Sequence, residues 1–407
     1  MERLPTELIV EICSYLCPHC CPCPDAENLL HAATTSSRSA LLNLCLTSSR
    51  LRAIAQPILY HHIHILNENV KSCEDLLNTM IHRPDLARAV RYLIRTRFAP
   101  RLDHRDGPRP DVWRIREGEH NVFQQLLVRV PRIEVLSIEL SSSYGLCLNP
   151  FEDLDTQPLS ALRTVKIAHW RAYHGCDLSF SMDDFFPLAA NINSLVLRFY
   201  DRVSTTLSLQ NVTCLILEKC NLEINCLRRL LSSCGKLDTF AYDGVLSPRS
   251  GLSPDDVVPL LEEQGHNLTL RRLCLCCCDN KEGDDLLVSF SQLQILRLRF
   301  EEWWGVRGED LQVEWLPPSL EEIALYDQDL SQGMNWIIEW KLEWISARAS
   351  SGFFPRLKKI ELNDLGPEAA QEKFPHLNIT RLRTTHLQTD GPGWIGEWST
   401  TPGGTPM

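Results

Sequence analysis

The sequence predicts an α/β protein in which a short all-α domain precedes an irregular repeat solenoid with a parallel, curved sheet. Three observations lead to this prediction. The first sixty residues carry apolar positions at helical spacing, a short apolar pattern recurs nine times after residue 130, and the chain has 407 residues. Because single cores stop growing at about 250–300 residues, a chain of this length forms two domains or an elongated array.

The charge balance of the chain is acidic. It has 41 Lys and Arg residues against 52 Asp and Glu residues, a formal net charge of −11. Neutralising phosphates needs a surplus of basic side chains, so this balance argues against a nucleic-acid binder. No apolar run reaches the roughly 18 residues that a membrane span requires. We therefore expect neither nucleic acid nor a membrane as a partner.

The 17 cysteines are the unusual feature of the composition, since their number is odd and their spacing irregular. The chain begins Met-Glu-Arg-Leu-Pro-Thr-Glu, with acids where a secretory signal peptide has a basic start. We expect an intracellular protein, in the cytoplasm or the nucleus, in which most cysteines are small buried hydrophobes.

The N-terminal sixty residues are expected to form three short helices. The first begins just after Pro5, the second contains the apolar run Leu41–Leu46, and the third follows the cap candidates Ser48 and Ser49 and stops at Pro57. So small a bundle cannot bury all of its apolar side chains, and we expect a partner to cover the rest. One face of the first helix carries Leu8, Ile9, Ile12, Cys13 and Leu16.

These residues resemble an F-box. The resemblance rests on Leu4-Pro5-x-Glu7-Leu8-Ile9-x-x-Ile12-x-x-x-Leu16, on the run Leu41–Ser48 and on Leu59-Tyr60. Domains of this family dock onto the Skp adaptor of a cullin-RING (SCF) ubiquitin ligase, and the C-terminal part of such proteins holds the substrate. By this resemblance the adaptor-docking face would consist of Leu4, Pro5, Leu8, Ile9, Ile12, Leu41, Leu44 and Leu51.

The sequence departs from the family between the first two helices, where residues 17–38 replace a short loop. Cys17-x-x-Cys20 and Cys20-x-x-Cys23, with His19, Cys21 and His31 nearby, offer thiolate and imidazole ligands for zinc. A dependable zinc module has a second such pair within about 12–20 residues, and this insertion has none. We therefore favour an exposed, proline-rich loop and assign no metal site and no cofactor.

Residues 61–130 are expected to be a connector that is partly helical, around residues 73–80, and rich in arginine. His62 and His64 would share one face of a strand and could form a metal pair. No third ligand adjoins them, so we favour a strand edge with polar side chains. Seven arginines lie between residues 88 and 109, and aspartates interleave with the later ones, which favours a solvated loop over a basic face for an acidic partner.

From residue 131 to 388 an apolar residue recurs at positions one, four and six of a short pattern, as in Leu270-x-x-Leu273-x-Leu275. Positions four and six alternate as in a strand with one face inward. A single strand cannot bury that face, so parallel units share a core and present the alternate side chains for binding. Two copies continue to Cys220 and Cys278 and resemble the cysteine-containing leucine-rich repeats of F-box proteins, which implies buried, structural thiols.

Cys274 and Cys276 would lie on the face opposite to Leu273 and Leu275, and we interpret them as structural rather than as zinc ligands.

Eight of the ten tryptophans lie between residues 303 and 398, and tryptophan is enriched among binding hot spots. Trp303 and Trp304, in a predicted loop between two repeats, are the candidate substrate-binding residues. From residue 301 onward acids outnumber bases by 17 to 9, so a basic substrate segment is expected. A helical stripe is interpreted as packing onto the array rather than as a partner anchor, and it consists of Trp336, Trp340 and Trp344.

No nucleophile elbow, phosphate-binding loop or metalloprotease helix occurs in the sequence, so we expect no enzyme and no catalytic residue. The expected function is that of a substrate receptor in an SCF ubiquitin ligase, which binds a Skp-type adaptor, through it a cullin, and a protein substrate of unknown identity. The alternative is a leucine-rich-repeat scaffold that binds a partner without any ligase. Residues 389–407 are expected to be a disordered tail.

Overall fold

The structure is a computed structural model whose chain divides into two compact units. The first unit contains the described residues up to Phe199 together with 208–211, and the second contains those of 200–203 and 212–381. The described residues are 4–17, 19–20, 26–66, 70–96, 121–141, 159–170, 177–178, 185–186, 188–200, 202–203, 208–244, 252–276, 287–299, 316–326, 335–362, 371–375 and 377–381.

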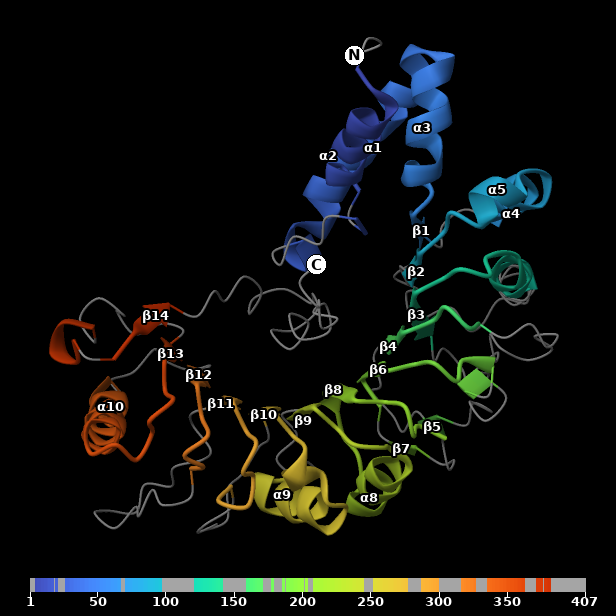
Figure 1. The fold of residues 1–407 in the computed structure, drawn as a ribbon. Coiled ribbons are helices and arrows are strands. Elements are labelled where there is room, and N and C mark those ends of the chain that lie inside the picture. Colours follow the sequence, from blue (N-terminus) through green and yellow to red (C-terminus); the bar gives the residue numbers. More distant parts are fainter. Residues whose placement is uncertain are drawn as a thin grey trace, which may run out of the picture. The chain divides into compact units, whose positions relative to one another are not determined.

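Three helices open the first unit, and both α1 (Thr6–Tyr15) and α2 (Ala26–Thr47) contact α3 (Ser49–Leu59) (Figure 1). As predicted, α1 begins directly after Pro5 and Ser48 caps α3. The hydroxyl oxygen of Ser48 accepts a hydrogen bond of 3.2 Å from the backbone N–H of Leu51. This bond satisfies one of the donors that a helix start leaves without an internal partner.

Two predicted boundaries are wrong. Residues 26–38 of the expected insertion are helical, because the stretch from Ala26 to Thr47 contains no proline or glycine to interrupt a helix. The third helix continues through Pro57 to Leu59. Proline removes one hydrogen bond, but the N–H of Tyr60 still donates to the carbonyls of Gln56 and Pro57, at 3.2 Å each, and closes the last turn.

Ser48→Ala is expected to lower the free energy of unfolding by about 0.5–2 kcal/mol, because the start of α3 loses its side-chain cap. The measurement is urea denaturation of the full chain followed by circular dichroism. Ser49→Ala, one residue further and exposed, is the matched control and should change stability by less than about 0.5 kcal/mol. Equal losses in the two variants would contradict the capping role.

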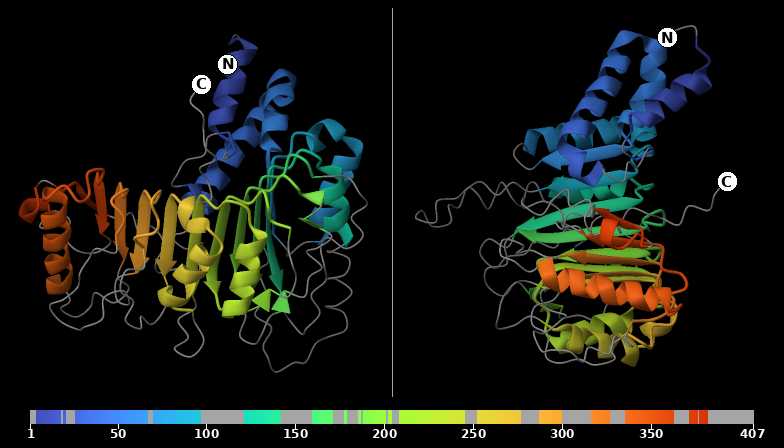
Figure 2. Two further views of the ribbon diagram at one scale, coloured as in Figure 1. Left: turned by 60° about the horizontal axis from the view of Figure 1, so that its bottom comes forward. Right: turned by 90° about the vertical axis from the view of Figure 1, so that its left-hand side faces the viewer.

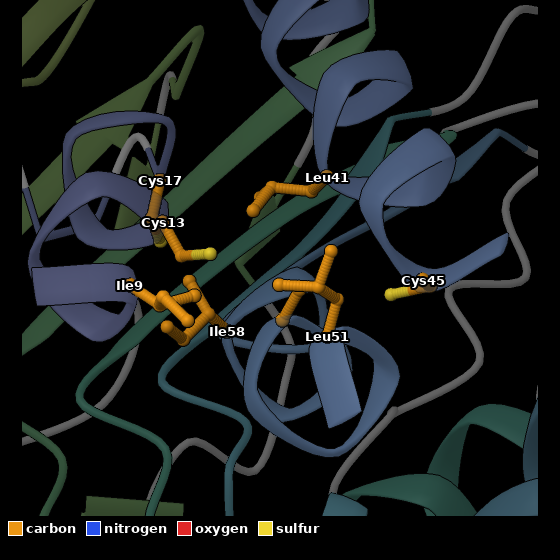
Figure 3. Packing of buried hydrophobic residues seen from close by; sticks show 8 residues of the cluster. Ile9, Cys13, Cys17, Leu41, Cys45, Leu51 and Ile58 are labelled. Atoms are coloured by element: carbon orange, nitrogen blue, oxygen red, sulfur yellow. The ribbon is translucent and has the colours of Figure 1, made fainter. Parts of the chain in front are cut away.

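The core of the helical bundle draws side chains from all three helices, including Ile9 of α1, Leu41 of α2 and Leu51 of α3 (Figure 3). Cys17, which follows α1, is also fully buried in this core. The core is small, and it consists of Ile9, Cys13, Cys17, Leu41, Cys45, Leu51, Ala55 and Ile58.

Five parallel strands follow in the first unit, in the order β1-β2-β3-β4-β6. Helices α4 (Val70–His82) and α5 (Pro84–Ala87) connect the first two strands, and a helix over residues 121–129 precedes the third. The strands are β1 (His62–Leu66), β2 (Tyr92–Thr96), β3 (Val135–Ser141), β4 (Thr164–Trp170) and β6 (Ser194–Arg198), with a short β5 (Asp177–Leu178) before the last.

Two of these strands, β1 and β2, lie in residues 61–130, which the sequence suggested as a connector. In β2 the repeat pattern reads Val90-x-x-Leu93-x-Arg95, so a charged residue stands where an apolar one was sought. Arg95 is nevertheless buried, with its guanidinium carbon 4.9 Å from the ring centre of Phe123. The apolar stem and the cation–π contact let arginine occupy a core position. The predicted helix around residues 73–80 is confirmed as α4.

The second unit has seven parallel strands in the order β8 to β14. Its helices α8 (Ile224–Ser233), α9 (Pro254–Glu263) and α10 (Asn335–Ser350) lie on one side of these strands (Figure 2), and a 3-10 turn follows α9 at His266–Leu268. The strands are β8 (Cys214–Cys220), β9 (Thr239–Gly244), β10 (Arg272–Cys276), β11 (Ile295–Arg299), β12 (Glu322–Tyr326), β13 (Lys359–Leu362) and β14 (Ile379–Arg381), and the short β7 (Arg202–Val203) also belongs to this unit.

All nine predicted copies of the apolar pattern lie on strands, which confirms the predicted parallel sheet. Within each unit, position four of each copy pairs with position four of the next. In the second unit each of these residues is at most 2% exposed, and they are Leu215, Phe240, Leu273, Leu296, Ile323 and Ile360. The common spacing therefore sets the register, because a shift by one residue would turn every apolar side chain to the other face.

The opposite face of the second unit's sheet differs from the prediction. The alternate positions were expected to present side chains for binding, but several are at most 3% exposed, among them Ile216, Ala241, Cys274 and Ala324. Parallel sheets are commonly buried on both faces. Cys274 and Cys276 lie with their sulfur atoms 3.9 Å apart.

Cys220 is buried, as predicted, while Cys278 lies outside the described residues. Lys219 adopts a left-handed φ of 50°, and the register of β8 against β9 shifts between Leu217 and Cys220. This bulge turns the thiol inward, where it donates to the carbonyl of Glu218 at 3.4 Å.

Within the described parts of the chain, no helix combines the length and the apolar character needed to cross a membrane.

Candidate functional site

The N-terminal helices leave an apolar surface exposed. Among the described residues nine large hydrophobic side chains are exposed, and five of these lie in α1 and α2. Exposed apolar residues scattered singly need no explanation, but their concentration on one small bundle is typical of a face that a partner covers. The five are Leu8, Val10, Tyr15, Leu42 and Leu46.

Each of the two helices carries two neighbouring apolar rows. In α1 the row with Ile9 and Cys13 enters the bundle core, and Ile9 is 2% exposed. The adjoining row contains Leu8, which is 46% exposed, with Ile12 four residues and Tyr15 seven residues further. Residues at this spacing share a helix face.

In α2 the same division holds. Leu41 and Cys45 are buried in the core, while Leu42 and Leu46, each one residue further, are exposed. An inner row thus holds the helices together, and an outer row on each helix remains open to a partner.

The structure places the eight residues predicted for docking in different environments. Ile9, Leu41 and Leu51 lie in the bundle core. Leu8 and Pro5 are exposed, and the partly buried residues are Leu4, Ile12 and Leu44. The predicted docking face did not include Leu42 and Leu46. Their spacing of four residues indicates an apolar row beside Leu41 and Cys45, but it does not tell which of the two rows faces α3.

The start of the chain is held in place by the start of α3. A guanidinium N–H of Arg50 donates to the carbonyl of Leu4 at 2.9 Å and to the hydroxyl of Thr6 at 3.3 Å. Arg52 ties α3 to the end of α2 through a 3.0 Å bond to the carbonyl of Cys45. These contacts hold the Leu4-Pro5 segment against α3 and the end of α2 against α3.

The N-terminal helices match a known family of domains. Residues 1–66 match the family model described as F-box-like. The N-terminal helices form an F-box-like domain. The match spans α1, α2, α3 and β1, and it ends with β1. No curated protein matches the chain. The parallel sheet with intervening helices that follows the F-box-like domain is consistent with repeats of the leucine-rich type.

Four potential metal ligands lie together beside the F-box-like core. Cys17, His19 and Cys20 follow α1, and His61 joins α3 to β1. Their ligand atoms all lie within 4.8 Å of one another. The sulfur of Cys20 lies 3.3 Å from Nδ1 of His61 and 3.5 Å from Nδ1 of His19, and the sulfur of Cys17 lies 3.8 Å from Nδ1 of His61.

The environment of this cluster shifts the pKa of two members. Burial raises the pKa of the Cys17 thiol to about 12, although backbone hydrogen bonds from Cys20 and His19 act in the opposite direction. Burial, assisted by the nearby His19 and Arg91, lowers the pKa of His61 to about 4. The imidazole of His61 is therefore neutral at pH 7, the form that binds metals.

The cluster differs from what the sequence suggested for this region. Cys17 is buried rather than part of an exposed loop. His62 and His64 do not belong to the one metal-ligand group found among the described residues. Nε2 of His64 instead lies 2.7 Å from the hydroxyl of Thr96, and the ring of His62 lies 5.8 Å from that of Tyr92.

The remaining predictions concern residues in the C-terminal part of the chain. Trp303, Trp304 and residues 389–407 lie outside the described residues, as do the side chains of the three tryptophans predicted as a stripe, although α10 contains them.

Proposed function

We propose that this protein is the substrate-recognition subunit of an SCF (cullin-RING) ubiquitin ligase. The observation that carries the proposal is the F-box-like domain of residues 1–66, whose first two helices expose apolar rows next to the rows that form the core. The domain binds a Skp-type adaptor and, through it, a cullin. The repeat-containing sheet that follows holds a protein substrate.

In this role the protein performs no chemistry of its own. It holds a substrate near the ubiquitin-charged enzyme of the ligase, and its contribution to rate is proximity and orientation. The substrate-binding residues remain the predicted Trp303 and Trp304, and a basic segment of the substrate is expected to meet the acidic C-terminal part of the chain.

The docking face consists of the exposed and partly buried members of the predicted set together with the outer row of α2. Leu8 and Leu46 are its most informative members, because both are exposed and neither belongs to the bundle core. Ile9, Leu41 and Leu51 support the face from within. The contacting residues are Leu4, Pro5, Leu8, Ile12, Leu42, Leu44 and Leu46.

Replacing Leu8 and Leu46 together by Asp tests this face. Two carboxylates would lose water on docking without gaining partners, so adaptor affinity is expected to fall at least about hundredfold, while the thermal unfolding temperature stays near that of the unchanged chain. The measurement is calorimetry or co-purification of the full chain with a Skp-type adaptor.

The matched control is the pair Leu268→Asp and Val288→Asp, two comparably exposed apolar residues of the second unit. This control is expected to bind the adaptor normally. Undiminished binding by the Leu8/Leu46 variant would contradict the docking face. An unchanged chain that binds no Skp-type adaptor would instead favour a repeat scaffold without a ligase.

A further inference from the structure

We infer that Cys17, His19, Cys20 and His61 form a structural zinc site that fastens the end of α1 to the start of the sheet in the first unit. Two thiols and two imidazoles meet at one place, although the first and last of these residues, Cys17 and His61, are 44 positions apart in the sequence. Cys₂His₂ is a common ligand set of structural zinc, whereas magnesium and calcium prefer oxygen ligands.

The separations suit a tetrahedral ion. Zinc binds sulfur at about 2.3 Å and nitrogen at about 2.0–2.1 Å, which places neighbouring ligand atoms roughly 3.3–3.8 Å apart. Three of the observed separations between ligand atoms are 3.3, 3.5 and 3.8 Å, and none exceeds 4.8 Å. Shifts of the ligand atoms by about 1 Å would therefore complete the tetrahedron.

The carboxylate of Glu134 orients one of the four ligands, His19. With Nδ1 of His19 facing the cluster, its Nε2 lies 3.3 Å from a carboxylate oxygen of Glu134. The other oxygen of Glu134 lies 3.1 Å from Nε of Arg91. A histidine that donates its outer N–H to a carboxylate is the usual arrangement around structural and catalytic metals, because the carboxylate fixes the ring and raises its basicity.

The position of the site indicates its role. Cys17 belongs to the core of the F-box-like domain, and the carbonyl of His61 accepts hydrogen bonds from the backbone N–H groups of Arg91 and Tyr92, at the start of β2. Zinc would thus link the helical domain to the first strands. If the proposed ligase function holds, this link keeps the adaptor-binding helices at a constant orientation to the strands that follow. Metal binding itself does not depend on that function.

The test is the zinc content of the full chain purified without chelators, measured by plasma mass spectrometry. About one zinc ion per chain is expected, and Cys20→Ser is expected to reduce the bound fraction at least tenfold. Cys20 is exposed, so its loss opens no cavity in the core. Cys73 lies outside the cluster, so Cys73→Ser is the matched control and should retain zinc.

A second measurement identifies the ligands. Cobalt(II) added to the metal-free chain is expected to give the intense visible absorption of tetrahedral cobalt with thiolate ligands, and His61→Asn should abolish it. Three results would overturn the inference: a chain without bound zinc or cobalt, a disulfide between Cys17 and Cys20, or loss of zinc on Cys23→Ser but not on Cys17→Ser. Adaptor binding, measured on the same samples, reports separately on the proposed function.

Discussion

Phe240→Ala is expected to lower the free energy of unfolding of the second unit by about 3–5 kcal/mol. Phe240 is fully buried at the inner face of β9, where it pairs with Leu215 of β8 and Leu273 of β10. Removing its ring leaves a cavity in the continuous apolar row, and neighbouring repeats cannot close it without shifting their shared register.

Guanidinium denaturation followed by circular dichroism measures the loss, and hydrogen exchange of the amides in β8, β9 and β10 shows where it falls. Leu268→Ala is the matched control, because Leu268 is large and apolar but exposed, and it should change stability by less than about 0.5 kcal/mol. Similar small effects in both variants would contradict the assignment of Phe240 to the core of the array.

Ile9→Ala is expected to destabilise the F-box-like domain by about 2–5 kcal/mol, whereas Leu8→Ala, at the adjacent residue, should change stability by less than about 0.5 kcal/mol. The two side chains differ in burial rather than in chemistry, since Ile9 is in the bundle core and Leu8 is on its surface. A core of eight residues has few contacts to spare, so one truncation removes a large part of its stability.

Thermal denaturation and limited proteolysis of the full chain measure this contrast. In the same samples adaptor binding should fall for Ile9→Ala only at temperatures at which the domain unfolds. If instead Leu8→Ala unfolded the domain and Ile9→Ala did not, the two apolar rows of α1 would have to be exchanged, and the proposed docking face with them.

The regular parts of the fold could be predicted because their signals are local. The spacing of Leu270, Leu273 and Leu275, repeated along the chain, predicts a strand and its inward face without reference to any other segment. The start of α1 after Pro5 and the cap at Ser48 depend on two or three residues. Arg95 in β2 departs from this pattern. Its burial could not be predicted locally, because it depends on a contact with Phe123, about thirty residues away in the sequence.

The candidate site could likewise be predicted only in its local features. The apolar rows of α1 and α2 are visible in the sequence as residues three or four apart. Which row faces α3 depends on how the helices pack, and periodicity does not contain that information. Likewise Cys17, His19 and Cys20 are adjacent in the sequence, but His61 reaches them only because α3 returns the chain to the end of α1.

The amino-acid sequence by itself determined the helical F-box-like start and the nine repeat strands, since helix capping and side-chain alternation act over a few neighbouring residues. Only the tertiary structure decided which leucines remain open to a partner and which four side chains form the Cys-His cluster. Those outcomes depend on contacts between segments tens of residues apart, and such contacts leave no periodic trace in the chain.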